Sequence, residues 1–312
     1  MFRIAAVILF FTTVLTAEEN ALFMLENLRY QLTHYYHKLL GTLDNDPKCN
    51  SVCTIAQQKR IRKNKIRIIT SVKSTKQKHM SLSMNVRGRI DLPNISKKLH
   101  LVFSQQGSDT LTNRQVDREN ENVITDTRFR IGLKYNFYHK NTLDISTKLS
   151  FKIHRPFGPF QVLSIKKLFT FPHDDFSIYT RGSLYYFYAY TFLAQSLECN
   201  FIQPLTSKYL LAFANEWENN AENHHNRRLT HHLRLHHNFN QKNHLVYWFS
   251  YGTLAKKENH YRIEWRAVSL SYIHYLNKWF YIQTIPRVVQ RREHNFRNDV
   301  ELTVSFAMLL GI

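Results

Sequence analysis

The residues best suited to chemistry are the histidines of the run 231–237, which reads His-His-Leu-Arg-Leu-His-His. Imidazole is a common metal ligand, so the run invites interpretation as a metal site. In a strand, His232 and His236 share a face but lie about 13 Å apart, too far to hold one ion without a neighbouring strand. We expect His244 to lie opposite His237 across a short turn. The default interpretation is imidazoles that line an interior or an interface, and neither a metal nor another cofactor is predicted.

Nucleophilic catalysis finds little support in the sequence. An acyl-transfer site needs a serine and a histidine within hydrogen-bond reach and a third group that orients the histidine. Serine and histidine are plentiful, but no G-x-S-x-G elbow, P-loop or G-x-G-x-x-G loop is present. Cys49 and Cys53 are spaced C-x₃-C, which is not the redox motif, and a local bridge and free thiols are both compatible with that spacing. We therefore predict a protein that is not an enzyme.

Cationic side chains are the most informative chemical feature. The formal net charge is +20, from 43 Lys and Arg against 23 Asp and Glu. Many of the cations alternate with apolar residues, and few acids such as Asp91, Glu198, Glu264 and Glu301 oppose them. The predicted inward set is Arg87, Arg89, Arg128, Arg130, Lys134, Lys148, Lys152, Arg181, Arg234, Arg262 and Arg266. Positive charges around a water-filled path raise the local concentration of anions, so this set predicts a route for anionic or small polar solutes.

Period-two alternation positions these cations. In the last segment every even position from 300 to 312 is apolar, whereas Glu301, Thr303 and Ser305 stand between them. Odd positions from 129 to 137 are also apolar, and they alternate with Arg128, Gly132 and other residues of the opposite face. Lys and Arg must stay hydrated, so the apolar face has to point outward. The sequence therefore predicts an all-β fold, a transmembrane antiparallel up-and-down β-barrel, whereas a soluble barrel would close its interior with apolar side chains.

The alternation defines fourteen candidate strands, an even number suited to a bacterial barrel. Twelve or sixteen strands are also compatible, because 159–170 and 259–273 alternate imperfectly, as strands with bulges do. Aromatic residues cluster near strand ends, as in interfacial girdles. The candidates are 65–73, 80–91, 97–106, 126–138, 142–154, 159–170, 175–187, 190–203, 207–217, 227–239, 243–254, 259–273, 278–289 and 298–311.

The N-terminal 64 residues differ from the rest. Residues 1–17 have the layout of a secretory signal peptide, and their apolar stretch of about a dozen residues is shorter than a membrane-spanning helix. Residues 18–64 follow as a periplasmic helix, with leucines at helical spacing over 20–40, and a polar connector with a basic run. The predicted organisation is thus signal peptide 1–17, helix and connector 18–64, and barrel 65–312.

A family resemblance rests on these features. The export signal, the alternating hairpins and a last strand from Val300 to Ile312 that carries Phe306 resemble Gram-negative outer-membrane β-barrel proteins of porin-like type. The resemblance implies an outer-membrane location, contact with lipids and lipopolysaccharide, and recognition of the last strand by the barrel-insertion machinery. The chain departs from the family in ending at Ile312 instead of an aromatic residue, and in being basic and poor in glycine.

The predicted function is a porin-like channel with a basic lumen for anionic or small polar solutes. Because the chain carries an export signal, nucleic acid is not an expected partner. Two alternatives stay open. An outer-membrane lipid-modifying enzyme would show a Ser/His pair at the external wall, and a closed structural barrel would show a salt-bridge network without a continuous aqueous path.

Overall fold

The computed structural model describes part of the chain. The described residues are 25–27, 29–35, 65–75, 80–92, 95–96, 98–104, 130–140, 142–152, 158–171, 176–188, 192–220, 226–255 and 260–310. Residues 25–27 and 29–35 are helical, which confirms a short N-terminal helix, and they belong to a compact unit separate from the strands. No described helix is long and apolar enough to cross a membrane. The predicted signal peptide, basic connector and Cys49–Cys53 pair lie outside the described residues.

The second unit is made of fourteen strands, which confirms the predicted number. A short 3₁₀ turn, η3 (Arg292–His294), precedes the last strand. The strands are β1 (Lys65–Thr75), β2 (Ser81–Asp91), β3 (Leu99–Ser104), β4 (Arg130–Lys140), β5 (Leu143–Lys152), β6 (Gly158–Phe171), β7 (Phe176–Phe187), β8 (Phe192–Pro204), β9 (Tyr209–Asn220), β10 (Asn226–Asn238), β11 (Asn243–Ala255), β12 (Arg262–Tyr275), β13 (Phe280–Arg291) and β14 (Asn298–Leu310).

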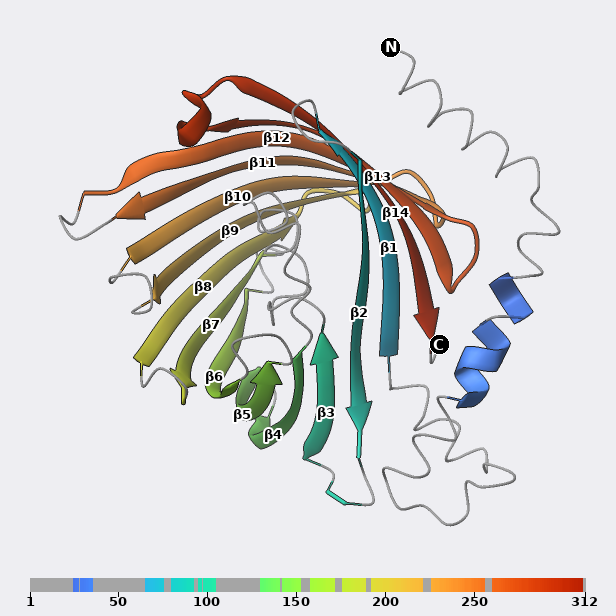
Figure 1. The fold of residues 1–312 in the computed structure, drawn as a ribbon, viewed down its shortest axis with the longest axis vertical. Helices are drawn as coiled ribbons and strands as arrows, with labels where there is room; N and C mark the ends of the chain where they lie inside the picture. The colour runs from blue at the N-terminus through green and yellow to red at the C-terminus, as the bar shows by residue number, and fades with distance from the viewer. Residues whose placement is uncertain are drawn as a thin grey trace. The chain divides into compact units, whose positions relative to one another are not determined.

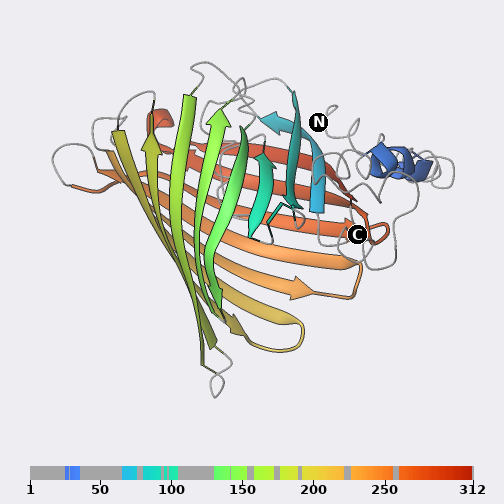
Figure 2. The ribbon, with the colours of Figure 1, turned by 90° about the horizontal axis from the view of Figure 1, so that it is seen from below.

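Each strand pairs antiparallel with the next one in the chain, and β14 pairs with β1 to close the barrel. Ser71 lies opposite Ser305 across this closure, and their hydroxyls are 2.8 Å apart. Figure 1 shows β1 beside β14, and Figure 2 shows the strands from a second side. Closure pairs the backbone of the first and last strands, so the sheet has no free edge.

Period-two burial follows the predicted alternation. In β6, Phe160, Val162 and Ser164 are buried, whereas Leu163 between them and Ile165 after them are exposed. Alternate side chains of a barrel strand face its interior and its exterior, so the buried set points inward. Large apolar side chains cover the outward positions, among them Leu133, Leu149, Phe151, Leu163, Leu184, Leu197, Phe249 and Val268. An apolar exterior of this extent suits contact with hydrocarbon and identifies a transmembrane barrel.

Two bulges interrupt the ladders. One shifts the β4–β5 register between Asn136 and Tyr138, and the other shifts the β11–β12 register between Gly252 and Thr253. At the second, a Cβ on Gly252 would collide with the indole of Trp265, so only glycine leaves room for this ring. Strand β4 also continues to Lys140, two residues beyond the end of the candidate strand 126–138.

Candidate functional site in the barrel interior

The interior wall carries charged side chains on almost every strand. Direct cross-strand pairing determines which positions face inward, starting from buried residues such as Arg87, Arg181 and Arg234. The inward cations of the described strands include Arg67, Lys73, Arg87, Arg89, Arg130, Lys134, Lys148, Lys166, Arg181, Arg228, Arg234, Arg287 and Arg291. The inward acids include Asp91, Asp144, Glu198, Glu216, Glu218, Asp299 and Glu301. Cations outnumber acids on the described wall, but the acids form clusters with them.

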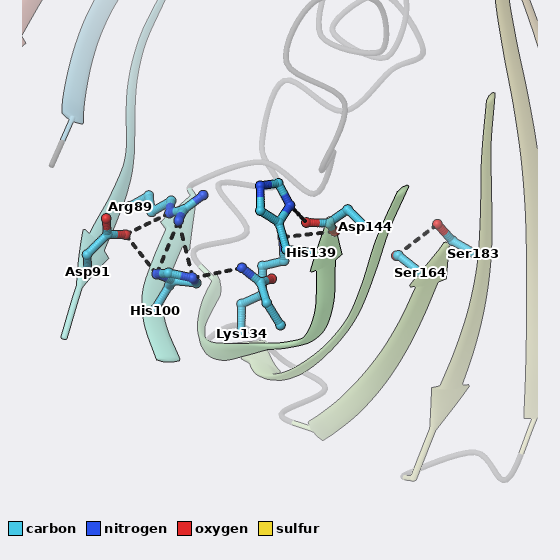
Figure 3. Close-up of polar contacts among 9 residues, drawn as sticks. Arg89, Asp91, His100, Lys134, His139, Asp144, Ser164 and Ser183 are labelled. Carbon is cyan, nitrogen blue, oxygen red and sulfur yellow. Dashed lines mark hydrogen bonds and ion pairs between the residues drawn. The ribbon is translucent and has the colours of Figure 1, made fainter. Parts of the chain in front are cut away.

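The first cluster surrounds His100 on β3, as Figure 3 shows. Asp91 on β2 accepts from His100 Nδ1 at 2.7 Å, and Arg89 Nε donates to the same oxygen at 2.8 Å. Asn136 on β4 lies 2.9 Å from His100 Nε2, a geometry that suits its amide as donor to an imidazole carrying its proton on Nδ1. His100 is buried, whereas the Arg89 side chain is 48% exposed. The cluster therefore presents a guanidinium to solvent while its imidazole is held from two sides.

A smaller cluster is centred on Asp144 at the start of β5. Its carboxylate lies 3.8 Å from Lys134 Nζ and 3.2 Å from His139 Nδ1. Both partners come from β4, the preceding strand, and Figure 3 shows the three side chains together. The arrangement neutralises part of the positive charge that the sequence assigns to Lys134.

The third cluster crosses the closure of the barrel. Glu301 on β14 accepts from Arg291 Nη2 on β13 at 2.8 Å and lies 3.4 Å from Lys73 Nζ on β1. Arg291 also donates to Asp299 at 3.1 Å, and Arg287 lies directly opposite Glu301 in the ladder. Because all of these groups are largely buried, each charge depends on its partners in place of water.

Two further buried arginines of the wall, Arg234 and Arg181, lie against an aromatic ring and across from an acid, respectively. Arg234 stacks on Trp248 with its Cζ 4.5 Å from the ring centroid. The indole of Trp248 also donates to His232 Nδ1 at 3.2 Å, so this imidazole is an acceptor in the interior. Arg181 lies directly opposite Glu198, and both are buried. These contacts stabilise the buried guanidinium groups without removing their charge.

A row of serines lies beside a row of charged side chains, which consists of Asp144, Lys166, Arg181 and Glu198. Ser146, Ser164, Ser183 and Ser196 lie opposite one another on β5 to β8, and all four are buried. The hydroxyls of Ser164 and Ser183 are 3.1 Å apart, as Figure 3 shows. The small serine side chains leave space for the longer side chains of the charged row beside them.

The structure places most of the predicted inward residues on the interior face. Arg87, Arg181 and Arg234 are buried there, and Arg89 and Lys134 belong to the clusters above. Arg130 and Lys148 both lie over the Phe160 ring, 5.1 and 5.8 Å from its centroid. Lys152 belongs to β5 and pairs with Arg130 through the backbone, and Arg128 lies outside the described residues.

Arg266 lies instead on the exterior face. Arg262 pairs with Leu254, but Arg266 pairs with Tyr251, and the β11–β12 register shifts between these pairs. The bulge reverses the inside–outside assignment of all following positions on β12, so two arginines four residues apart no longer share a face. Arg266 is exposed and donates to Gln290 beside it. The alternation alone could not show where the extra residue lies.

Several interior charges were not in the predicted set, notably Lys73, Lys166, Arg287 and Arg291 together with the acids Asp144, Glu216 and Asp299. Arg287 shares its face with Ile285 and Val289, which are also buried. An inward face that mixes apolar and charged residues carries no clear alternation signal, which explains the omission. Asp299 could have been predicted from the alternation, because it lies two residues before Glu301 and therefore faces the same side of β14.

The histidine run is divided between the two faces. His232 and His236 point inward, whereas His231 points outward and hydrogen-bonds to Asn215. The expectation that His244 lies opposite His237 is wrong: His244 pairs with Asn238, at 2.7 Å between Nδ1 and Oδ1, and His237 pairs with Leu245. Among the described residues no group of three histidines, cysteines or acids is placed to hold a metal ion.

Comparison with known proteins yields structural similarity only. No family model and no curated protein matches the sequence. The in-vitro folded OmpT, an outer membrane protein of Vibrio cholerae, is 9% identical with a TM-score of 0.47, over 79% of this chain and 96% of that chain. The outer membrane channel DcaP of Acinetobacter baumannii is 6% identical with a TM-score of 0.45, over 78% and 96%.

The KdgM porin is 9% identical with a TM-score of 0.37, over 78% of this chain and 98% of that chain. At these identities and TM-scores the likeness assigns neither a solute nor an activity to this chain. What the chain itself provides is a closed fourteen-stranded antiparallel barrel with an apolar exterior and a charged interior.

Proposed function

We propose that this barrel is a porin-like channel of an outer membrane that passes anionic or small polar solutes. The observation that carries the proposal is the excess of lysine and arginine over acids on the inward positions of a closed fourteen-stranded wall. Fixed positive charge in a hydrated path attracts anions and repels cations, without covalent chemistry.

The strand number supports a hydrated interior. An eight-stranded barrel is just wide enough for its side chains to fill it, and barrels of 16 to 18 strands leave an aqueous channel. Fourteen strands lie nearer to the second class. Charged groups such as Arg89, which is 48% exposed, require water or partners, and a hydrated lumen supplies the water.

The clusters limit how selective the channel is. Each of Asp91, Asp144 and Glu301 lies within 4 Å of at least one cationic nitrogen, so part of the wall is neutralised locally. Only the cations in excess of these acids then attract anions into the lumen. We expect a weak preference for anions and passage of neutral polar molecules, in place of strict selection.

The test is single-channel recording of the purified chain in a planar bilayer under a salt gradient. The expected result is steady conductance with a reversal potential on the anion side. An inserted and folded barrel without conductance would overturn the proposal and favour the closed structural barrel. Hydrolysis of bilayer phospholipids by the same preparation, absent from an unfolded control, would favour the lipid-modifying enzyme.

The location is part of the proposal. An export signal at 1–17 and a barrel that inserts from the periplasm would bring the chain to the outer membrane, in contact with lipopolysaccharide and after passage through the barrel-insertion machinery. Fractionation of cells that produce the full chain, with mass spectrometry of its N-terminus, tests both points. Recovery in the inner-membrane fraction, or an uncleaved N-terminus, would count against them.

A further inference from the structure

The apolar exterior of the barrel is interrupted by a continuous row of polar side chains. Consecutive members lie directly opposite each other on neighbouring strands from β6 to β13, and all are at outward positions. The row, which we term the polar seam, consists of Lys167, Thr180, Cys199, Asn215, His231, Tyr251, Arg266 and Gln290.

The seam runs between two rows of a different character. On one side lie Ile178, Phe201, Phe213, Leu233, Phe249, Val268 and Val288, again directly opposite one another. On the other side, Leu197, Trp217 and Leu229 adjoin its centre. The seam is therefore a line of polar groups within an apolar surface and does not belong to a polar rim.

The seam crosses the exterior from one rim to the other. Lys167 pairs with Leu143, the first residue of β5, and so lies near the rim of the β4–β5 turn. At the other end, Gln290 pairs with Asn298, the first residue of β14, near the opposite rim. Barrel strands tilt by about 35–45°, so a row perpendicular to them runs diagonally over the membrane-facing wall.

Polar side chains are least favourable at the centre of the seam, where the wall faces the hydrocarbon of the membrane. Asn215 and His231 lie near the middle of β9 and β10, at the depth of the hydrocarbon. They hydrogen-bond at 2.6 Å, which satisfies one donor and one acceptor, but the Asn215 amide N–H groups and His231 Nε2 still need partners that lipid tails do not offer. Tyr251 stacks on His231 with ring centroids 4.5 Å apart, so the pair is held in place.

Other parts of the exterior lack such a line at their described positions. The outward residues of β14 are Val300, Leu302, Val304, Phe306, Met308 and Leu310, and those of β2 are Leu82, Met84, Val86, Gly88 and Ile90. Polar groups that are concentrated on one side of a membrane barrel, beside stacked aromatic rings, resemble the core of a protein interface more than a lipid-facing wall.

We propose that the β8–β11 exterior is the interface of a homodimer, in which the polar seam meets the seam of a second copy of this chain. Two copies in one membrane share their orientation, so their two-fold axis lies along the membrane normal. Rotation about this axis makes the two diagonal seams cross as an X. They meet only at their centres, where Cys199, Asn215 and His231 lie.

The polar groups of the seam can hydrogen-bond to the same groups of a second copy of the chain. Asparagine amides and neutral imidazoles both donate and accept, so each central group can pair with its symmetry mate. The cations Lys167 and Arg266 lie toward opposite ends, near opposite rims, and diverge in the crossed arrangement, so no like charges meet. The proposal does not depend on whether the barrel conducts.

The first test is the oligomeric state of the purified full chain in lipid nanodiscs, measured by native mass spectrometry. We expect a dimer for the wild type. The double variant Asn215→Leu/His231→Leu should raise the dimer dissociation constant at least tenfold, while it keeps the circular dichroism and the heat-dependent gel migration of a folded barrel, because the change makes the lipid-facing wall more apolar. The matched control Thr70→Leu, on the outward face of β1, should leave the dimer unchanged.

The second test uses Cys199 as a reporter in a background with Cys49→Ala and Cys53→Ala. A short bismaleimide should join two copies through Cys199, whereas Thr70→Cys with Cys199→Ala should give no cross-link. A monomeric wild type, with lipid or an unrelated protein on the seam, overturns the proposal. So does a dimer that survives the double variant or cross-links only through position 70.

Discussion

Glu301 on β14 lies 3.4 Å from Lys73 on β1, which places an ion pair directly across the closure of the barrel. The same carboxylate accepts from Arg291 on β13 at 2.8 Å, so one buried acid links three neighbouring strands, including the first and the last. The pairing makes the closure specific as well as hydrogen-bonded, because a register slip would separate these charges.

Replacement of this acid should therefore weaken the barrel. We expect Glu301→Gln to lower the free energy of unfolding by about 3 kcal/mol, because it leaves buried cations without their counter-charge. Urea titration of the folded barrel in lipid vesicles measures the change. As a control, Glu264→Gln removes a partly exposed acid that lies 4.0 Å from Arg292 Nη1, and should change stability by less than about 0.5 kcal/mol. Equal effects of the two variants would contradict the conclusion that Glu301 stabilises the closure of the barrel.

Ion selectivity should depend on inward cations and not on outward ones. Arg89→Gln removes an exposed guanidinium of the lumen and should move the reversal potential under a salt gradient toward zero. Arg266→Gln removes the same charge from the exterior face and should leave the reversal potential unchanged. A larger shift with Arg266→Gln would mean that the face assignment after the β11–β12 bulge is incorrect.

The β11–β12 bulge should not tolerate a side chain at Gly252. Gly252→Ala places a Cβ against the Trp265 indole and should destabilise the barrel by about 1–3 kcal/mol, since the ring must move within a packed wall. Gly182→Ala is the matched control, because a Cβ there meets nothing within 4 Å. Urea titrations of the two variants under the same conditions decide the point, and a neutral Gly252→Ala would show that the indole has space to shift.

A charged side chain on the exterior should destabilise the barrel in lipid when it lies near the middle of a strand. Leu163 lies outward on β6, exposed and well away from both strand ends. Leu163→Arg should lower the free energy of unfolding in lipid by about 2–4 kcal/mol, as expected for arginine in the hydrocarbon midplane. The same substitution at Gln161, nearer the strand end, should cost less. If both variants were as stable as the wild type, this wall would not face hydrocarbon.

The sequence by itself indicated about fourteen strands, with twelve and sixteen left open, and it indicated which face of most strands is apolar. Each strand separates two environments, so residues such as Leu302 and Val304 alternate with Glu301 and Thr303 in a pattern visible without any partner strand. The same alternation led to the expectation that Arg87, Arg181 and Arg234 face the interior, and all three side chains are buried in the structure.

Only the tertiary structure decided which residues meet. Register is a relation between strands, so the pairing of Lys73 with Glu301, separated by most of the barrel sequence, has no local signal. One extra residue in β12 moves Arg266 to the exterior, because a single-residue shift exchanges the two faces of a strand. The polar seam likewise consists of one residue per strand, and only the closed sheet brings Cys199, Asn215 and His231 into line.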